Sequence, residues 1–425
     1  MRVVINQSVA LSPRTGIGHY AAELLRCLRQ QAGEDRIDAY PDGWLRRLRQ
    51  SAGRLRKHLE PKSSNPAGEP EAPAPRGRLL LRRLKVRALE CLRQCDHFVT
   101  ARHLQAACNR HGYDLYHEPN MIPLPCDRPT VVTVCDLSVP LHPEWHPADR
   151  VAYFEKHFQR GVRGCAHFLA ISEFGRREVI QHLGVAPERV TRTYMGVRPG
   201  LGRLPADEVA GVRRRLGLPV RYLLYVGTVE PRKNVRMLLR AYCALPAGLR
   251  ERWPLLLVGR WGWGSRDVAE FYQAEARHRG VRQVGYLAEE HLPAVYNAAR
   301  ALVFPSFYEG FGLPPVEMMA CGGAVLASTA GAVAEVVGGR AHLIDPEDID
   351  GWRGAMQRVL TDDDWWRSLR QGVVEAASRF TWESCAADTL RVYRQLCASP
   401  RRRPPSPSPL PPRGGEGRVR GRRAA

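Results

Sequence analysis

Short runs of apolar residues alternate along the chain with segments whose apolar side chains recur every three or four positions. The runs predict buried strands, and the periodic segments predict amphipathic helices. In the first half the predicted strands are Val3–Ile5, Leu115–His117, Thr130–Val134 and Phe168–Ile171. In the second half they are Arg221–Val226, Pro254–Val258, Val281–Gly285, Ala301–Phe304 and Ala324–Ala327. Strands that alternate with helices indicate an α/β fold with parallel sheets.

The alternation is interrupted once, by a segment rich in Gly and Pro at residues 195–205, and then restarts. The length of 425 residues also favours two domains, since single cores rarely exceed about 250–300 residues. We therefore expect two doubly wound, Rossmann-like domains. Such domains bind ligands at the carboxyl ends of their strands, so a site in a cleft between facing domains is expected. The expected boundaries are 1–197, 198–382, a last helix at 383–400 and a tail at 401–425.

The net charge of +21 is concentrated in two stretches outside this pattern. Residues 44–93 carry 14 Lys and Arg against 4 Glu, and residues 401–425 carry 8 Arg against 1 Glu. A basic insertion at about 44–100 would suit either a helix on an anionic membrane surface or a helical hairpin packed on its own domain. The Arg- and Pro-rich tail lacks the apolar content needed to fold, and we expect it to be disordered.

The eleven cysteines show no metal-site spacing, although Cys91 and Cys95 lie four residues apart within an amphipathic pattern. Buried, reduced thiols are therefore favoured over a structural zinc site. No apolar run is long enough to span a membrane, and the N-terminal residues do not resemble a secretion signal. These features predict a cytoplasmic protein.

The stretch FYEGFGLPPVEMMACG places Glu309 and Glu317 on either side of a turn rich in Gly and Pro. Pro314 and Pro315 suit the first turn of a helix, so backbone N–H groups near Gly312 would face the cleft and form a phosphate site. The carboxylate of Glu317 could accept hydrogen bonds from both hydroxyls of a ribose. Glu309 would then face the group beyond the phosphates.

Cations that could offset these carboxylates occur in the stretch YVGTVEPRKN. Arg232 and Lys233 follow a predicted strand and precede a predicted helix. Arg offers a bidentate fork to phosphate oxygens, and Lys offers a compact charge. Together they could stabilise a leaving diphosphate, so we expect neither a metal ion nor a cofactor.

The segments GTVEPRKNVRMLLRAY and FPSFYEGFGLPPVEMMACGGAVLAS, in this order, resemble glycosyltransferase family 4, whose members are retaining sugar transferases with the GT-B fold. The N-terminal segments TGIGHYAAELL and AISEFGRREVIQHLGV are similar to the family more weakly, and FTWESCAADTLRVYRQL resembles its closing helix. The whole resemblance covers roughly residues 1–30 and 113–400. The resemblance implies that the second domain holds a nucleoside-diphosphate sugar and the first holds the acceptor. It also implies that the last helix crosses back to the first domain.

The resemblance further implies roles for individual residues. Arg232 and Lys233 would hold the diphosphate, Glu317 the ribose and Glu309 the donor sugar. The expected catalytic residues are Glu309, Arg232, Lys233 and Asp136. The expected donor-binding residues are Gly16, Gly18, Gly227, Gly310, Phe311, Gly312, Leu313 and Glu317.

The sequence departs from the family at Cys135, in VVTVCDLSVPLHPEWHP, where a histidine that contacts the donor sugar is usual. A thiol is a weak hydrogen-bonding group and cannot replace an imidazole. Three interpretations remain open. Asp136 and a nearby histidine such as His117 take over, the sugar differs at this point, or Cys135 is a plain buried thiol.

The resemblance favours GDP-mannose as donor, with a UDP-sugar as the alternative, and a glycan or lipid-linked acceptor in cell-envelope polysaccharide synthesis. A peripheral location at the inner face of the membrane would fit such an acceptor. A nucleic-acid-binding protein, the rival of a different class, would rest on the two basic stretches alone. An epimerase or a phosphorylase on a similar fold is a third interpretation, against which the paired RK and E-x7-E motifs argue.

Overall fold

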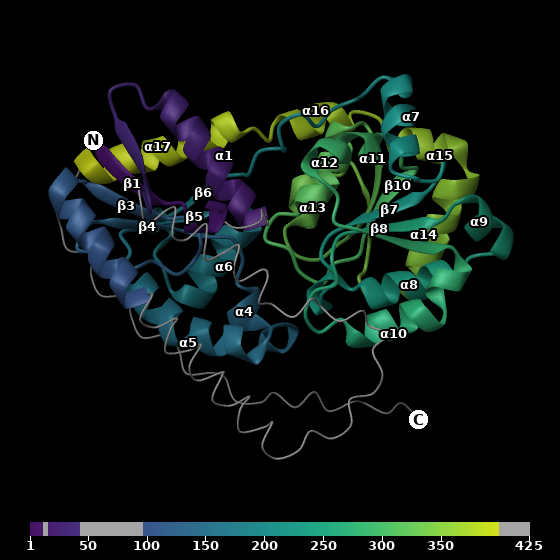
Figure 1. Ribbon diagram of the computed structural model, residues 1–425, viewed down its shortest axis with the longest axis horizontal. Helices are drawn as coiled ribbons and strands as arrows, with labels where there is room; N and C mark the ends of the chain where they lie inside the picture. The colour runs from purple at the N-terminus through teal and green to yellow at the C-terminus, as the bar shows by residue number, and fades with distance from the viewer. Residues whose placement is uncertain (12–15, 43–96, 399–425) are drawn as a thin grey trace, which may run out of the picture.

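The computed structural model describes residues 1–11, 16–42 and 97–398, and these residues form two lobes, each built on a parallel six-stranded sheet (Figure 1). The sheet of the first lobe has the order β2-β1-β3-β4-β5-β6, and that of the second has the order β12-β11-β10-β7-β8-β9. In each sheet the chain adds strands on one side of its first strand and then on the other. The predicted pair of doubly wound α/β domains is therefore confirmed.

The first sheet contains β1 (Arg2–Asn6), β2 (Arg36–Tyr40), β3 (Leu115–Glu118), β4 (Thr130–Val134), β5 (His167–Ala170) and β6 (Val190–Arg192). Every residue of β3, β4 and β5 is buried, as expected for interior strands covered on both faces. The helices of this lobe are α1 (Gly16–Gln31), α4 (Ser138–Leu141), α5 (Ala148–Arg163), α6 (Glu173–Leu183), the helical residues 97–111 and the 3₁₀ turns η1 (Ser8–Leu11), η2 (Pro143–Trp145) and η3 (Pro187–Arg189).

The second sheet contains β7 (Leu223–Val226), β8 (Leu255–Val258), β9 (Val281–Gly285), β10 (Ala301–Phe304), β11 (Ala324–Ser328) and β12 (His342–Ile344). Its longer helices are α7 (Ala206–Arg215), α8 (Val235–Cys243), α9 (Ala247–Arg252), α10 (Arg266–Ala274), α11 (Leu292–Ala298), α12 (Leu313–Ala320) and α14 (Ile349–Thr361). Shorter ones are α13 (Val333–Val337), α15 (Asp363–Ser368), α16 (Val373–Ser378) and the 3₁₀ turns η4 (Pro231–Lys233), η5 (Ala276–Arg279) and η6 (Glu289–His291). The order reverses between β7 and β10, which places a topological switch point at the carboxyl ends of these two strands.

The last helix, α17 (Trp382–Ala398), lies against α1 of the first lobe, at the other end of the sequence (Figure 1). Tyr393 Oη lies 2.5 Å from Nδ1 of His117 in β3, and Arg394 pairs with Asp35 at 3.0 Å. Buried apolar residues of α1 and α17 belong to one continuous core cluster. Residues that follow the second sheet therefore complete the first lobe.

Two segments of the described chain pass between the lobes, and they run beside each other. The first follows β6 and the second precedes α17. The backbone N–H of Val197 donates to the carbonyl of Phe380 at 2.9 Å. A Cβ on Gly196 would lie 2.4 Å from the backbone nitrogen of Trp382, so only glycine allows this approach. The paired segments form a two-stranded connection, and the expected boundary at residues 197 and 198 falls within it.

Two predicted features lie outside the described residues. They are most of the basic insertion, including Cys91 and Cys95, and the Arg- and Pro-rich tail. Within the described ranges, no helix combines the length and apolar character needed to cross a bilayer.

Candidate active site

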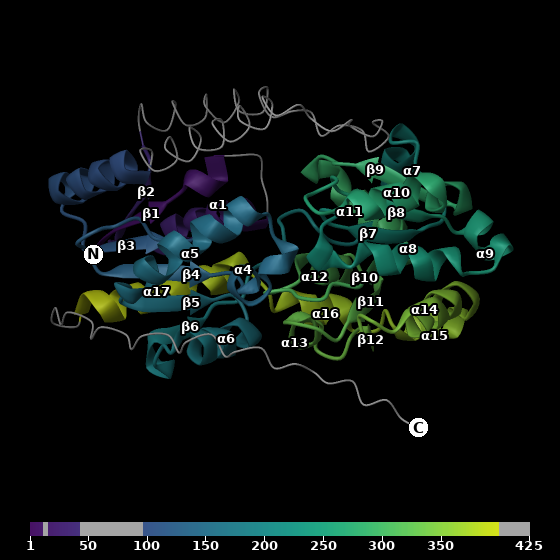
Figure 2. The same cartoon turned by 90° about the horizontal axis from the view of Figure 1, so that it is seen from below.

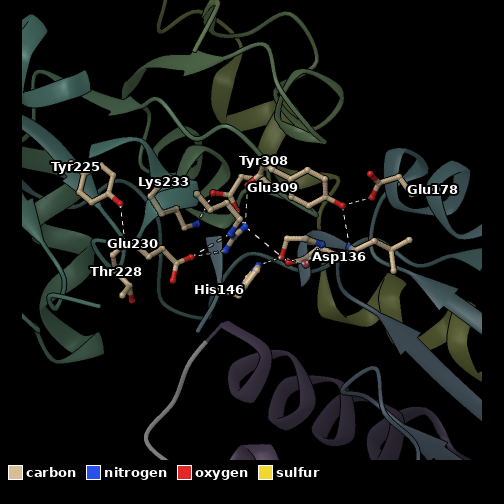
Figure 3. A network of polar contacts seen from close by, with 12 residues as sticks. Asp136, His146, Glu178, Tyr225, Thr228, Glu230, Lys233, Tyr308 and Glu309 are labelled. Atoms are coloured by element: carbon tan, nitrogen blue, oxygen red, sulfur yellow. Dashed lines mark hydrogen bonds and ion pairs between the residues drawn. The ribbon is translucent and has the colours of Figure 1, made fainter. Parts of the chain in front are cut away.

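The switch point of the second sheet brings the two charged motifs together. The turn that follows β7 leads into η4, which carries Arg232 and Lys233, and the loop that follows the neighbouring strand β10 carries Glu309. Parallel neighbours end at the same edge of a sheet, so residues 76 positions apart in the sequence become neighbours in space. Figure 3 shows Lys233 and Glu309 directed toward each other.

Glu309 accepts from both cations. Lys233 Nζ donates to its Oε1 at 2.5 Å, and Arg232 Nη1 donates to its Oε2 at 3.0 Å. The carboxylate is 6% exposed. Burial alone would raise the pKa of Glu309, but the charges of Lys233 and Arg232 outweigh burial and hold it below its ordinary value. Glu309 thus stays ionised beside two cations in a partly dehydrated setting.

Arg232 is fixed by further acceptors. Its Nη2 contacts Glu230 Oε1 at 3.1 Å, and its Nη1 also donates to the carbonyl of Tyr308 at 3.0 Å. Asp136 of the first lobe approaches Arg232 Nη1 to 4.0 Å (Figure 3). A guanidinium held from several directions loses little entropy when it binds phosphate, so its orientation is set before a ligand arrives.

Asn234 anchors the turn that presents both cations. It has a left-handed φ of 54°, which Asn tolerates better than most residues. Its Nδ2 donates to the carbonyls of Pro305, at 3.2 Å, and Pro346, at 2.7 Å. Asn234 was not among the residues predicted from the sequence, although its place directly after the RK pair is a signal for this role.

Gly310 lies at a close contact between the two lobes. A Cβ at this position would lie 1.9 Å from the carbonyl oxygen of Cys135 in the first lobe, and 3.0 Å from Cβ of Asp136. Any side chain would therefore separate the lobes. This glycine permits the contact between the loop after β10 and the loop after β4.

The thiol of Cys135 does not replace a histidine in the site. It is 6% exposed, burial raises its pKa, and its nearest polar partner is the carbonyl of Pro119 at 3.9 Å. The interpretation that His117 takes over is wrong. Its ring is fully buried between Tyr393 and Thr133, and burial lowers its pKa to about 3. Of the two residues considered, Asp136 alone reaches the cation cluster.

Glu317 is the fifth of the eight residues of α12, which begins after Gly312, a residue with a left-handed φ of 95°. It is 1% exposed and accepts from Tyr296 Oη at 2.7 Å. Nη2 of Arg198, from the connecting segment, lies 3.2 Å from its other oxygen. Arg198 lines a cavity of about 370 Å³ between the lobes, formed also by His19, Glu23, Pro199, Gly200, Leu204, Glu208, Val212, Glu289, Glu290, Pro293 and Ala294.

The other expected donor-binding residues occupy several places. Gly16 and Gly18 lie in the first turn of α1. Gly227 directly follows β7 and has a φ of 155°, and Leu313 begins α12. The side chain of Phe311 packs edge-on against Phe380, with ring centroids 5.3 Å apart, so it belongs to the apolar core. Only the backbone of Phe311 is left to face a ligand.

Contacts between the lobes involve residues that the sequence analysis missed. Tyr308 Oη donates to Glu178 in α6 and accepts from the backbone N–H of Leu137 at 3.0 Å (Figure 3). Glu335 of the second lobe caps α6 by accepting from its first two backbone N–H groups at 2.7 and 2.8 Å. In Figure 2, α6 of the first lobe and α13 of the second, which carries Glu335, face each other at the boundary between the lobes. No local sequence signal identifies such pairs, since their partners lie more than 100 residues away.

The burial of the Glu178 carboxyl between the lobes should make stability depend on pH, although its hydrogen bond with Tyr308 acts in the opposite direction. Burial raises the pKa of Glu178 from 4.5 to about 7, with Asp136 contributing. The folded protein thus favours the protonated form of Glu178. Its contribution to the free energy of unfolding is complete below pH 4.5 and is lost as the pH rises to 7. Between pH 5 and 7 we expect the melting temperature of the wild type to fall by a few degrees relative to Glu178→Gln, which mimics the protonated acid. If the melting temperatures of the two proteins changed equally between pH 5 and 7, the raised pKa assigned to Glu178 would be contradicted.

Among the residues that the structure describes, no group of three or more His, Cys, Asp or Glu side chains is arranged to hold a metal ion. The positive charge identified at the switch point comes from Arg232 and Lys233.

Comparison with known proteins places these features in context. A family model described as glycosyl transferases group 1 matches residues 213–380. O-antigen chain mannosyltransferase B of Escherichia coli is 32% identical over 399 residues, which cover 93% of this chain and 100% of the relative. Two solved structures share the fold. Sucrose-phosphate synthase of Thermosynechococcus elongatus has a TM-score of 0.65 and 21% identity, and covers 94% of this chain and 99% of its own. Anabaena HepE, in complex with UDP and glucose, has a TM-score of 0.64 and 17% identity, with 93% and 100% covered.

Proposed function

This chain belongs to the family of glycosyl transferases group 1, and we propose that it transfers mannose from GDP-mannose to a glycan or lipid-linked acceptor with retention of configuration. The donor sugar is proposed from the E. coli relative, whose name describes a mannosyltransferase of O-antigen chains. The alternative donor is a UDP-sugar, which the complex of HepE with UDP and glucose keeps open. A nucleic-acid-binding role gains no support from the comparisons.

The observation that carries this proposal is the cluster of Lys233, Arg232 and Glu309 at the switch point. Two cations held at the carboxyl ends of β7 and β10 suit a diphosphate, and Glu309 between them suits the attached sugar. Glu317 is proposed to bind the ribose. The backbone near Gly16, Gly18, Gly227, Gly310 and Gly312 is proposed to lie along the donor.

The proposed chemistry is attack on the same face of the sugar that the leaving group departs from. The bond from the anomeric carbon to the phosphate oxygen breaks, and a bond to the acceptor oxygen forms. The acceptor proton passes to the leaving phosphate. Arg232 and Lys233 would stabilise the charge that develops on the phosphate, a role a divalent metal fulfils elsewhere, so activity should persist in EDTA.

The cavity beside Arg198 supports a guanine base. Glu289 and Glu290 of η6 lie on its wall. Guanine presents two adjacent donors, its N1–H and 2-amino group, which match the two oxygens of one carboxylate. Uracil presents a single ring N–H. A wall of carboxylates therefore favours GDP over UDP as the nucleotide.

The proposal can be tested by a thermal-shift panel of GDP, UDP, ADP and their common sugars, with EDTA present. A ligand at one hundred times its Kd stabilises the folded protein by about 2.7 kcal/mol, which raises the melting temperature measurably. We expect GDP and GDP-mannose to give the largest shift, and Glu317→Gln to reduce it. A larger shift with UDP would replace GDP-mannose by a UDP-sugar as the proposed donor. The absence of any shift would count against nucleotide-sugar binding.

The acceptor is proposed from the name of the E. coli relative, which describes O-antigen chains. An O-antigen-like polysaccharide on a lipid carrier would place the enzyme at the cytoplasmic face of a membrane. The basic insertion that would contact the bilayer lies mostly outside the described residues.

A further inference from the structure

Arg198 stands outside every motif that suggested the function. It lies in the segment that connects the lobes, between β6 and α7. Its Nη2 nonetheless lies 3.2 Å from Oε1 of Glu317, the carboxylate proposed to bind the ribose. The Arg198 side chain is 18% exposed, while the Glu317 side chain is 1% exposed. Among the described residues, the one cation that pairs with Glu317 within 4 Å thus comes from the interlobe connection.

The two oxygens of Glu317 have different environments. Oε2 accepts a well-formed hydrogen bond from Tyr296 Oη at 2.7 Å. Oε1 has the charge of Arg198 beside it but makes no aligned hydrogen bond with any described residue. A buried carboxylate without a counter-charge is costly, and Arg198 provides that charge. Oε1 is itself buried, and because the contact is not aligned it retains its capacity to accept hydrogen bonds from a group that reaches it.

The charge and the position of Arg198 depend in turn on Glu317. Burial lowers its pKa, but Glu317, and to a smaller extent Glu289, outweigh burial and raise it. Its Nε is buried and makes no hydrogen bond within the described part of the chain. The guanidinium therefore has no competing partner on that nitrogen, and its closest carboxylate contact is Glu317. It also lines the cavity in which we place the nucleoside.

We propose that Arg198 is a positioning residue for the donor: it orients Glu317 so that Oε1 accepts hydrogen bonds from the ribose hydroxyls. This inference rests on the proposed role of Glu317. Since Arg198 belongs to the connecting segment, the ribose site is complete only when that segment lies against α12. Recognition of the ribose is then coupled to the arrangement of the two lobes.

The test compares GDP with 2′,3′-dideoxy-GDP, which lacks both ribose hydroxyls, by isothermal titration calorimetry. Hydrogen bonds to a charged group commonly change affinity on the order of 10-fold to 100-fold, so the wild type should prefer GDP by that factor. In Arg198→Met the ratio of the affinities for GDP and for the dideoxy compound should fall close to one, and the same is expected of Glu317→Gln. Arg198→Lys, which keeps the charge, should retain part of the preference for GDP. The double variant should lose no more than either single variant, because the two residues act as one unit.

Arg192→Met is a matched control from the end of β6, just before the connecting segment, because Arg192 packs over Tyr194 and makes no ion pair with Glu317. It should keep the full preference. If Arg198→Met does not fold, Arg198→Gln carries the same comparison. An unchanged preference for GDP in a folded Arg198 variant would overturn the inference and leave the proposed function intact. A wild-type protein that binds no nucleoside diphosphate would overturn both.

Discussion

Replacing Gly310 by alanine is expected to lower kcat at least about 100-fold while each lobe stays folded. A Cβ at this position would lie 1.9 Å from the carbonyl oxygen of Cys135, more than 1 Å inside a normal contact. The clash involves backbone, so the lobes can relieve it only by moving apart. A displacement of about 1 Å at a reacting centre commonly costs about 100-fold in rate. Because the proposed donor site lies mainly in the second lobe, the Kd for GDP should change much less than kcat.

Gly354→Ala is the matched control for this variant. Gly354 lies within α14, and an added Cβ would meet no atom within 4 Å. Alanine there should leave kcat unchanged. Full activity of Gly310→Ala would show that sugar transfer does not need the lobes as close as they are in this structure.

Replacing Lys233 by alanine is expected to lower kcat by about 100- to 1,000-fold, the usual cost of one preorganised group that stabilises developing charge. Its Nζ is the closest cation to Glu309, at 2.5 Å, and lies 5.3 Å from the centre of the Phe304 ring. Stability should fall only modestly, because Arg232 remains to compensate Glu309. Steady-state kinetics with GDP-mannose and a melting curve measure the two effects separately.

An exposed ion pair on the same lobe provides the control. Arg266 pairs with Glu270 at 2.9 Å on α10, and its side chain is 87% exposed. Arg266→Ala removes one positive charge from the lobe without touching the switch point, so kcat should be unchanged. A stable Lys233→Ala variant with wild-type kcat would remove Lys233 from the proposed mechanism.

The apolar pattern predicts every interior strand of the two described sheets and misses β2, β6 and β12. All three missed strands lie at the edge of a sheet. Solvent reaches one side of an edge strand, so its sequence need not be a continuous apolar run. β2, for example, contains Arg36 and Asp38, which pair with each other at 2.7 Å. These three strands were therefore missed because they lie at solvent-exposed edges and lack a continuous apolar run.

The candidate site likewise has one part that the sequence predicts and another that it does not. The cluster of Arg232, Lys233 and Glu309 follows from short motifs whose order along the chain matches neighbouring strand ends. The contacts of Arg198 with Glu317 and of Tyr308 with Glu178 could not be predicted. They depend on how the two lobes meet, and a single sequence holds no signal for the distance between residues 130 positions apart.

The position of α17 bears on the order in which the protein can fold during synthesis. The first lobe opens the chain, yet a helix made only after the whole second sheet covers α1 and meets His117 in its core. The second lobe is continuous in sequence and can form as soon as it leaves the ribosome. The lobe that is translated first must therefore keep an apolar face uncovered through most of translation, and it is the last to be completed.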